Sequence, residues 1–176
     1  MKAMRAAILF AGLAALSNLA TVAALPWLIN AVVMHRIAAL AGGYNHALTA
    51  PRADAKARTV VRPSPDMLYT ACAFDIFEHP LRITAPVQDS YVSISAFDAA
   101  TNNFFAVNDS TVSPGADGQK HFNIVIARNE VAVPAGAKLV VSPTDRGLIL
   151  FRSLVRRNAD VPALERIQSQ QDCRPL

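Results

Sequence analysis

The N-terminal part of the chain is dominated by one long hydrophobic stretch. Between Arg5 and His35 lie 29 residues without a formal charge. A hydrocarbon core about 30 Å thick is crossed by about 20 helical residues, so the stretch is long enough for a transmembrane helix. Lys2 and Arg5 precede it. Because positive residues of this kind tend to stay in the cytoplasm, the rest of the chain is predicted to be exported.

The stretch divides near its C-terminal end. Pro26 lacks a backbone donor and is expected to kink or end the regular helix. Trp27, which follows it, is a residue type enriched at membrane–water interfaces. We therefore predict that residues 6–25 span the membrane and that residues 26–41 form an interfacial or emerging helix. Asn18 is the only strongly polar side chain near the middle of the predicted span.

A cleaved signal peptide is the alternative interpretation of this N-terminus. Lys2 and Arg5 would form its positive region, residues 6–19 its apolar core, and small residues ending at Ala24 its cleavage site. Hydrophobic sequence resumes directly after Ala24, which favours a retained anchor. The mature chain is then a single-pass protein of the cytoplasmic (inner) membrane with a periplasmic C-terminal domain. With cleavage it would be secreted to the periplasm.

Beyond residue 58 the pattern changes to short apolar or alternating segments separated by turns rich in Pro, Gly and Asp. The segment at 91–97 alternates clearly, with Val92, Ile94 and Ala96 on one face. Short strands without long intervening helices predict a mainly β domain, either an antiparallel sandwich or barrel-like. The predicted strands are 59–62, 67–77, 81–85, 91–97, 103–107, 122–127 and 138–141.

The C-terminal part is predicted to contain one short helix. Asp160 is a plausible N-cap, and Val161, Leu164 and Ile167 recur at helical spacing. The apolar run at 147–155 fits either a strand or a helix. The predicted organisation is a membrane anchor and emerging helix at 1–41, a polar connector at 42–58 and an exported β domain at 59–176.

Charge and cysteine content exclude some classes of function. Apart from Lys2 and Arg5, the chain has 15 basic and 13 acidic residues. The basic residues form no patch in the sequence, which argues against nucleic-acid binding. Cys72 and Cys173 are able to pair in an oxidising compartment, and the alternative is a buried free thiol at Cys72. The sequence has no CxxC motif and no Cys/His cluster, so we expect no metal site. It also contains no cofactor motif, and any cofactor stays unknown.

Several short motifs occur in a characteristic order along the β domain. The segment VRPSPDMLYT at 61–70 is followed by Asp75 and Pro80, then by YVSIS at 91–95 and by the turn DAATNNF at 98–104. In this order the motifs resemble the bacterial family known as domain of unknown function 1254. The resemblance implies a mainly β, exported or membrane-anchored protein. It also implies an envelope protein partner, of which a domain of unknown function 1214 protein is one candidate. It supplies no catalytic residues.

The polar residues of these motifs are the candidate binding residues: Asp66, Tyr69, Asp75, Asp98, Asn102 and Arg152. Carboxylates brought together are able to act as acid and base, whereas carboxylates spread along the chain serve as turn caps. Arg152 lies inside an apolar run, and a buried arginine needs a partner. We therefore expect an ion pair between Arg152 and one of the aspartates.

Two functions are compatible with these observations. The first is a membrane-anchored envelope protein whose periplasmic β domain binds a partner or a small molecule. The alternative is a periplasmic hydrolase-like enzyme that uses an Asp/Arg cluster. An enzyme should gather the candidate residues in one concave pocket, whereas a binding module should scatter them.

Overall fold

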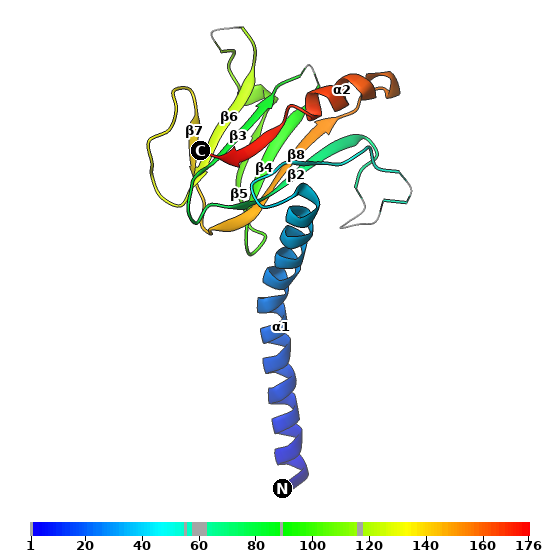
Figure 1. Cartoon of the computed structure of the whole chain (residues 1–176). Coiled ribbons are helices and arrows are strands. Elements are labelled where there is room, and N and C mark those ends of the chain that lie inside the picture. Colours follow the sequence, from blue (N-terminus) through cyan, green and yellow to red (C-terminus); the bar gives the residue numbers. More distant parts are fainter. Residues whose placement is uncertain (1, 55, 58–62, 89, 116–117) are drawn as a thin grey trace.

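The computed structural model of the chain describes residues 2–54, 56–57, 63–88, 90–115 and 118–176 (Figure 1). The strand predicted at 59–62 lies outside these residues. The two helices are α1 (Lys2–Ala41) and α2 (Val161–Gln168), and two 3-10 turns cover Asp109–Thr111 and Asn158–Asp160. The strands are β1 (Leu48–Thr49), β2 (Met67–Asp75), β3 (Leu81–Pro86), β4 (Val92–Asp98), β5 (Asn103–Asn108), β6 (His121–Ala127), β7 (Lys138–Val141), β8 (Arg146–Leu154) and β9 (Asp172–Pro175).

The strands form two sheets that pack face to face as a sandwich. The first sheet has the order β1-β2-β8-β4-β5 and the second the order β7-β6-β3-β9. All strand pairs are antiparallel except β6 with β7, which are parallel. The predicted mainly β sandwich with a long apolar N-terminal helix and a short C-terminal helix is confirmed.

The ambiguous run at 147–155 forms β8, the central strand of the first sheet. It pairs with β2 on one side and β4 on the other. Its alternate residues Gly147, Ile149, Phe151 and Ser153 are buried, and Ile149 and Phe151 belong to the main core. The alternation of buried and partly exposed side chains has the two-residue period of a strand. Pairing with β2 and β4 on both sides makes the segment a strand and not a helix.

Two strands were not predicted from the sequence. β1 lies within the predicted connector, and Leu48 pairs with Ala71 of β2. β9 follows α2 and pairs with β3, so that Cys173 lies opposite Ile83. A disulfide joins Cys173 to Cys72 of β2 in the other sheet. β9 is therefore tied to the domain by a covalent bond as well as by backbone pairing.

The short helix α2 covers one end of the sandwich. Val161 and Leu164 pack against Leu68 in a small separate cluster. Asp160 occupies the predicted N-cap position, but its side chain makes no capping hydrogen bond. Its carboxylate instead accepts hydrogen bonds from Arg157 Nε and Nη2 at 3.2 and 2.9 Å. The predicted capping interaction is thus replaced by a local ion pair.

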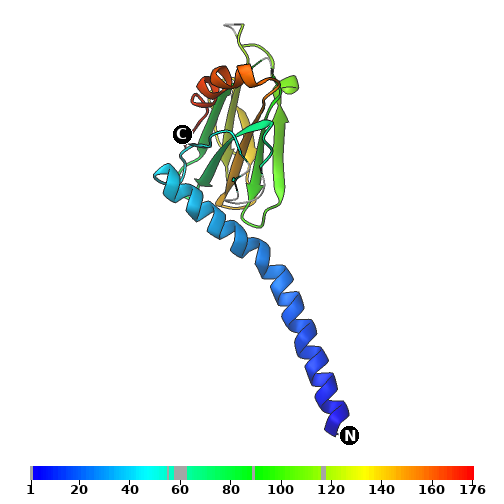
Figure 2. The same cartoon turned by 90° about the vertical axis from the view of Figure 1, so that its right-hand side faces the viewer.

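The helix α1 continues through Pro26 and ends at two glycines. It is bent along its length, as Figure 2 shows, but it remains helical from Lys2 to Ala41. Gly42 has a φ of 84°, and the amide of Gly43 donates to the carbonyl of Ala38 at 2.8 Å. Such a left-handed residue with a returning hydrogen bond is a common helix terminus. Pro26 therefore does not end the helix, although an ending was one of the two expectations.

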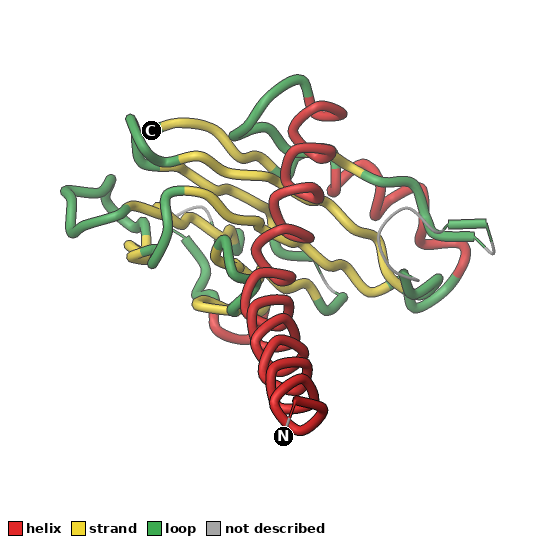
Figure 3. The backbone as a smooth tube through the Cα atoms, turned by 90° about the horizontal axis from the view of Figure 1, so that it is seen from below, coloured by secondary structure: helices red, strands yellow, loops and turns green. Residues whose placement is uncertain are grey.

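The last third of α1 packs against the first sheet. Met34, Ile37 and Ala38 are buried and form a cluster with Ala73 of β2. Figure 3 shows α1 from below as it crosses the strands. The segment predicted as an interfacial or emerging helix is therefore also part of the domain. In contrast, the helix is exposed from residue 2 to residue 25.

Asn30 fixes the beginning of this packed segment. It is buried, and its Nδ2 donates to the backbone carbonyl of Asp98 at 2.8 Å. Replacing Asn30 with Ala is expected to lower the free energy of unfolding of the β domain by about 1 kcal/mol, because one buried hydrogen bond is lost. Urea denaturation in detergent measures this. Asn129→Ala is the matched control and should have no effect, since Asn129 is exposed in the turn that follows β6.

Candidate functional site

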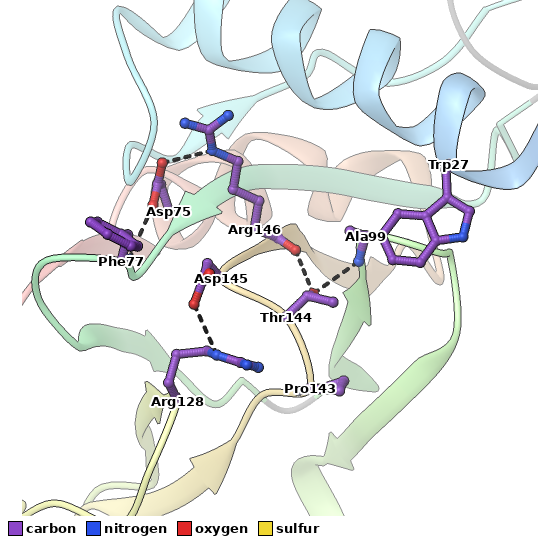
Figure 4. Close-up of a pocket in the computed structure, with 9 residues that line it drawn as sticks. All are labelled: Trp27, Asp75, Phe77, Ala99, Arg128, Pro143, Thr144, Asp145 and Arg146. Carbon is purple, nitrogen blue, oxygen red and sulfur yellow. Dashed lines mark hydrogen bonds and ion pairs between the residues drawn. The ribbon is translucent and has the colours of Figure 1, made fainter. Parts of the chain in front are cut away.

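An open pocket lies at the end of the sandwich next to α1 (Figure 4). Its volume is about 450 Å³, within the usual range for small-molecule sites. We call it the α1 pocket. Trp27 comes from α1, Asp75 and Phe77 from the end of β2, and Ala99 from the β4–β5 turn. Three residues of the β7–β8 connection, the first residue of β8 and the residue after β6 complete the lining: Pro143, Thr144, Asp145, Arg146 and Arg128.

Two ion pairs line the α1 pocket. Arg146 Nε donates to Asp75 Oδ2 at 2.7 Å, and Arg128 Nε lies 2.9 Å from Asp145 Oδ1. The other oxygen of Asp75 accepts from the amide of Phe77 at 3.1 Å. Each arginine comes from a different strand end than its carboxylate. The pocket therefore carries both signs of charge on its wall.

Asp75 raises the pKa of Arg146 above its ordinary value, through the hydrogen bond first and Coulomb attraction second. This interaction stabilises the fold at every pH below the ordinary pKa of arginine, which is far above neutrality. The contribution is lost only as the pH rises through the raised folded-state pKa. The pair is partly exposed to solvent, with exposed fractions of 58% for the Arg146 side chain and 24% for the Asp75 side chain. It therefore introduces no pH dependence near neutrality.

Removing the charge of Asp75 is expected to have a small effect on stability. Exposed ion pairs contribute up to about 1 kcal/mol, so Asp75→Asn should lower the free energy of unfolding by less than that. Chemical denaturation of the variant and the wild type measures the difference. A loss above about 2 kcal/mol would contradict the solvated character of this pair.

Thr144 connects the turns around the pocket. Its Oγ1 accepts from the amide of Ala99 at 3.0 Å and donates to the carbonyl of Arg146 at 2.7 Å. Arg128 Nη1 also donates to the carbonyl of Ser142 at 2.7 Å. The β4–β5 turn and the β7–β8 connection are thereby held together, so the pocket wall is built from fixed backbone.

Two aromatic residues on the pocket lining are accessible to solvent. The exposed fraction of Phe77 is 78% and that of Trp27 is 50%. On the same side of the sandwich, the Arg146 guanidinium lies 5.2 Å from the centre of the Tyr44 ring. Exposed aromatic side chains beside charged groups are typical of binding surfaces. The arrangement fits a binding role.

The structure separates the residues that the sequence proposed for one site. Asp75 lines the α1 pocket, whereas Asp66 precedes the opposite end of β2. Asp75 lies nine positions after Asp66 along extended chain, which separates the two by about 30 Å. Tyr69 lies near Asp66, and its hydroxyl accepts from the amide of Ser64 at 3.1 Å. Asp66 and Asp75 therefore do not share a site.

Asp98 and Asn102 form a closed turn between β4 and β5. Asp98 Oδ1 accepts from the amides of Ala100 and Asn102 at 2.9 and 2.8 Å. Its Oδ2 accepts from Asn102 Nδ2 at 2.9 Å. Thr101 between them has a φ of 69°. These hydrogen bonds occupy both oxygens of a buried carboxylate, so Asp98 acts as the cap of this turn.

The expected ion pair of Arg152 is wrong. Its Nη2 donates to Ser95 Oγ at 3.0 Å, and its Nε is buried without a hydrogen-bond partner among the described residues. Arg152 stands in the middle of β8, opposite Tyr69 and Ser93. The aspartates lie at or beyond strand ends, so strand geometry keeps them away from it.

Sequence reasoning missed most of the pocket. Arg128 was not considered, Asp145 and Arg146 fell in a predicted turn, and Phe77 was taken as the end of a strand. The polar turn SPTDRG at 142–147 was the available signal, because it places two opposite charges side by side.

Among the described residues, no group of three or more His, Cys, Asp or Glu side chains is arranged to hold a metal ion.

Comparisons with known proteins identify a family and a fold. Residues 44–175 match the family described as Protein of unknown function (DUF1254). No curated protein matches the sequence. The VPA0106 protein from Vibrio parahaemolyticus superimposes with a TM-score of 0.55 at 18% identity, over 64% of this chain and 28% of VPA0106. A putative uncharacterized protein from Burkholderia cenocepacia gives a TM-score of 0.48 at 15% identity, over 73% of this chain and 34% of that protein.

Proposed function

This chain belongs to the family described as Protein of unknown function (DUF1254), and we propose that it is a membrane-anchored envelope protein whose β domain binds a partner or small molecule. The chain spans 28% of the length of VPA0106, so the likeness to that protein concerns the fold alone. The proposal rests on α1 and on the α1 pocket.

The exposure of α1 supports the membrane anchor and is the observation that carries the proposal. The helix is apolar and long enough to cross a membrane, and none of its most hydrophobic 18-residue window is buried. Its 40 residues extend about 60 Å, twice the thickness of a hydrocarbon core. In water this surface would be a large exposed apolar patch, whereas in a bilayer it is solvated.

The same helix supports a position of the domain close to the membrane. The buried Asn30 lies only five positions after Leu25, the last residue of the proposed span. This is a helix rise of about 7.5 Å. Trp27 lies within that interval and also lines the α1 pocket. The pocket is therefore proposed to lie beside the outer surface of the cytoplasmic membrane, with Lys2 and Arg5 on the inner side.

The geometry of the pocket supports binding and gives no support to the hydrolase alternative. Asp66 lies far from Asp75, both oxygens of Asp98 are occupied, and Arg152 pairs with a serine. The α1 pocket is open and is lined by exposed aromatic side chains and two ion pairs. We propose that its occupant is an envelope component such as a domain of unknown function 1214 protein, or a small molecule.

Site-specific crosslinking tests this function in intact cells. A photoreactive phenylalanine analogue at Phe77 should give one dominant adduct, because this side chain projects from the pocket lining. The matched control places the same analogue at Val131, which is 37% exposed and lies outside the pocket. Mass spectrometry identifies the adduct. Equal labelling at both positions, or no adduct at position 77, would contradict binding at the α1 pocket.

A further inference from the structure

Asn18 lies in the proposed membrane span, and its side chain has no hydrogen-bond partner among the described residues of its own chain. The proposed span runs from residue 6 to residue 25, so Asn18 lies about 18 Å from one end and about 10 Å from the other. Thr21 Oγ1 in the next turn donates to the carbonyl of Ser17 at 2.8 Å and is satisfied within the helix. The Asn18 carboxamide is exposed and makes no hydrogen bond to any residue that the structure describes.

An unpaired carboxamide is costly in hydrocarbon, where no water replaces the missing hydrogen bonds. The amide of Asn has both donor and acceptor atoms, so two copies of the same side chain satisfy each other across a two-fold axis. Asn30 provides the contrast within the same helix, since it is buried and bonded to Asp98. Asn18 needs a partner outside the chain, and a second Asn18 is chemically sufficient.

Up to Thr21, the helix face around Asn18 carries mostly small side chains, and Val22 and Leu25 continue the same face toward the β domain. Small or polar residues recur at spacings of four and three along it: Ala7, Ala11, Ala14, Asn18 and Thr21. This is the spacing of a left-handed helix pair, and small side chains let two backbones approach closely in a membrane. The bulky residues Leu9, Leu13 and Leu16 lie on the other side of the helix.

The same face points away from the β domain. Asn30 and Met34 mark the side of α1 that packs on the first sheet. At 100° per residue, they are turned about 120° and about 160° from Asn18 around the helix axis. Two copies are thus able to meet through the Asn18 face while their β domains lie on opposite outer sides. Neither domain blocks the contact.

From these observations we infer that the chain self-associates in the membrane as a parallel dimer through the Asn18 face of α1. This inference rests on the proposed membrane anchor and names a second copy of the chain as a partner. It adds a contact that is independent of the α1 pocket. The dimer would hold two pockets at fixed positions on the same membrane surface.

Energy transfer between labelled copies tests the dimer. Full-length chains carrying a donor or acceptor dye after Leu176 are reconstituted in phosphatidylethanolamine–phosphatidylglycerol vesicles over a range of protein-to-lipid ratios. Asn18→Leu is expected to weaken association about 5- to 30-fold, the effect of one interhelical hydrogen bond in model peptides. Asn18→Gln should retain association. Ala20→Leu, on the opposite face beside Leu9, Leu13 and Leu16, should leave it unchanged.

Three results would overturn the inference. Wild-type chains that are embedded but monomeric at all ratios would overturn the dimer while leaving the anchor intact. Association that is the same in Asn18→Leu as in the wild type would exclude this face. Chains that carbonate removes from the vesicles would overturn the anchor and the dimer together.

Discussion

Removing the Cys72–Cys173 disulfide is expected to lower the free energy of unfolding of the β domain by about 4 kcal/mol. The bond closes a loop of 101 residues and joins β2 of one sheet to β9 of the other. In the chain-entropy model a loop of this size restricts the unfolded chain strongly. Both cysteines are also fully buried, with exposed fractions of 0% and 1%.

Urea denaturation of the Cys72→Ala/Cys173→Ala double variant, compared with the oxidised wild type, measures this effect. The reduced wild type is the control, because it lacks the bond but keeps both side chains. It should be destabilised to a similar extent. A loss below about 1 kcal/mol in both proteins would show that the remaining contacts of β9 hold the C-terminus without the bond.

Substituting Gly147 with Ala is expected to destabilise the domain by about 3 kcal/mol or more. Gly147 lies in β8 between Phe74 of β2 and Asp98 of β4. An added Cβ would meet the backbone carbonyl of Phe97 and would lie 2.5 Å from the Phe74 ring. Neither neighbour is the end of a flexible chain, since one is backbone and the other is a fully buried ring.

Thermal or chemical denaturation of Gly147→Ala measures this cost. Gly12→Ala is the matched control, because nothing lies within 4 Å of the Cβ it would add. That variant should leave the unfolding of the β domain unchanged. A Gly147→Ala protein as stable as the wild type would mean that the strands shift to admit a methyl group at no cost.

The fold was largely predictable from local pattern. Segments with a period of two became strands, and α2 begins at Val161, one residue after the predicted cap. The sequence did not distinguish a strand from a helix at 147–155 because both faces of the run carry apolar residues. Its core face packs in the sandwich, while Leu148 on the other face contacts the α1 cluster. A strand covered on both sides loses the alternation that identifies it.

The elements that were missed depend on distant parts of the chain. β9 has the sequence DCRP, which carries charge and a proline and so lacks a strand pattern. Its pairing with β3 and its disulfide to Cys72 are contacts between distant residues. β1 has only two residues and forms beside β2. No window of local sequence contains these interactions.

The candidate site could be predicted only in part for the same reason. Asp75 was one of the sequence candidates and lines the α1 pocket, but its partner Arg146 lies 71 positions away. Asp98 was proposed for binding, yet its oxygens accept from residues two and four positions later. Sequence reveals such local caps more readily than pairs between strand ends, because topology determines the latter.

The central claim is that the mature chain keeps α1 as a membrane anchor. Cleavage after Ala24 would leave the packed segment from Asn30 onward in place, so the β domain would fold in either case. The size and the location of the mature chain therefore distinguish a retained anchor from a cleaved signal peptide. Intact-mass measurement of the chain from a carbonate-washed membrane fraction makes the test. The account predicts a membrane-embedded chain of the full 18.8 kDa. A periplasmic chain shortened by the first 24 residues would contradict it.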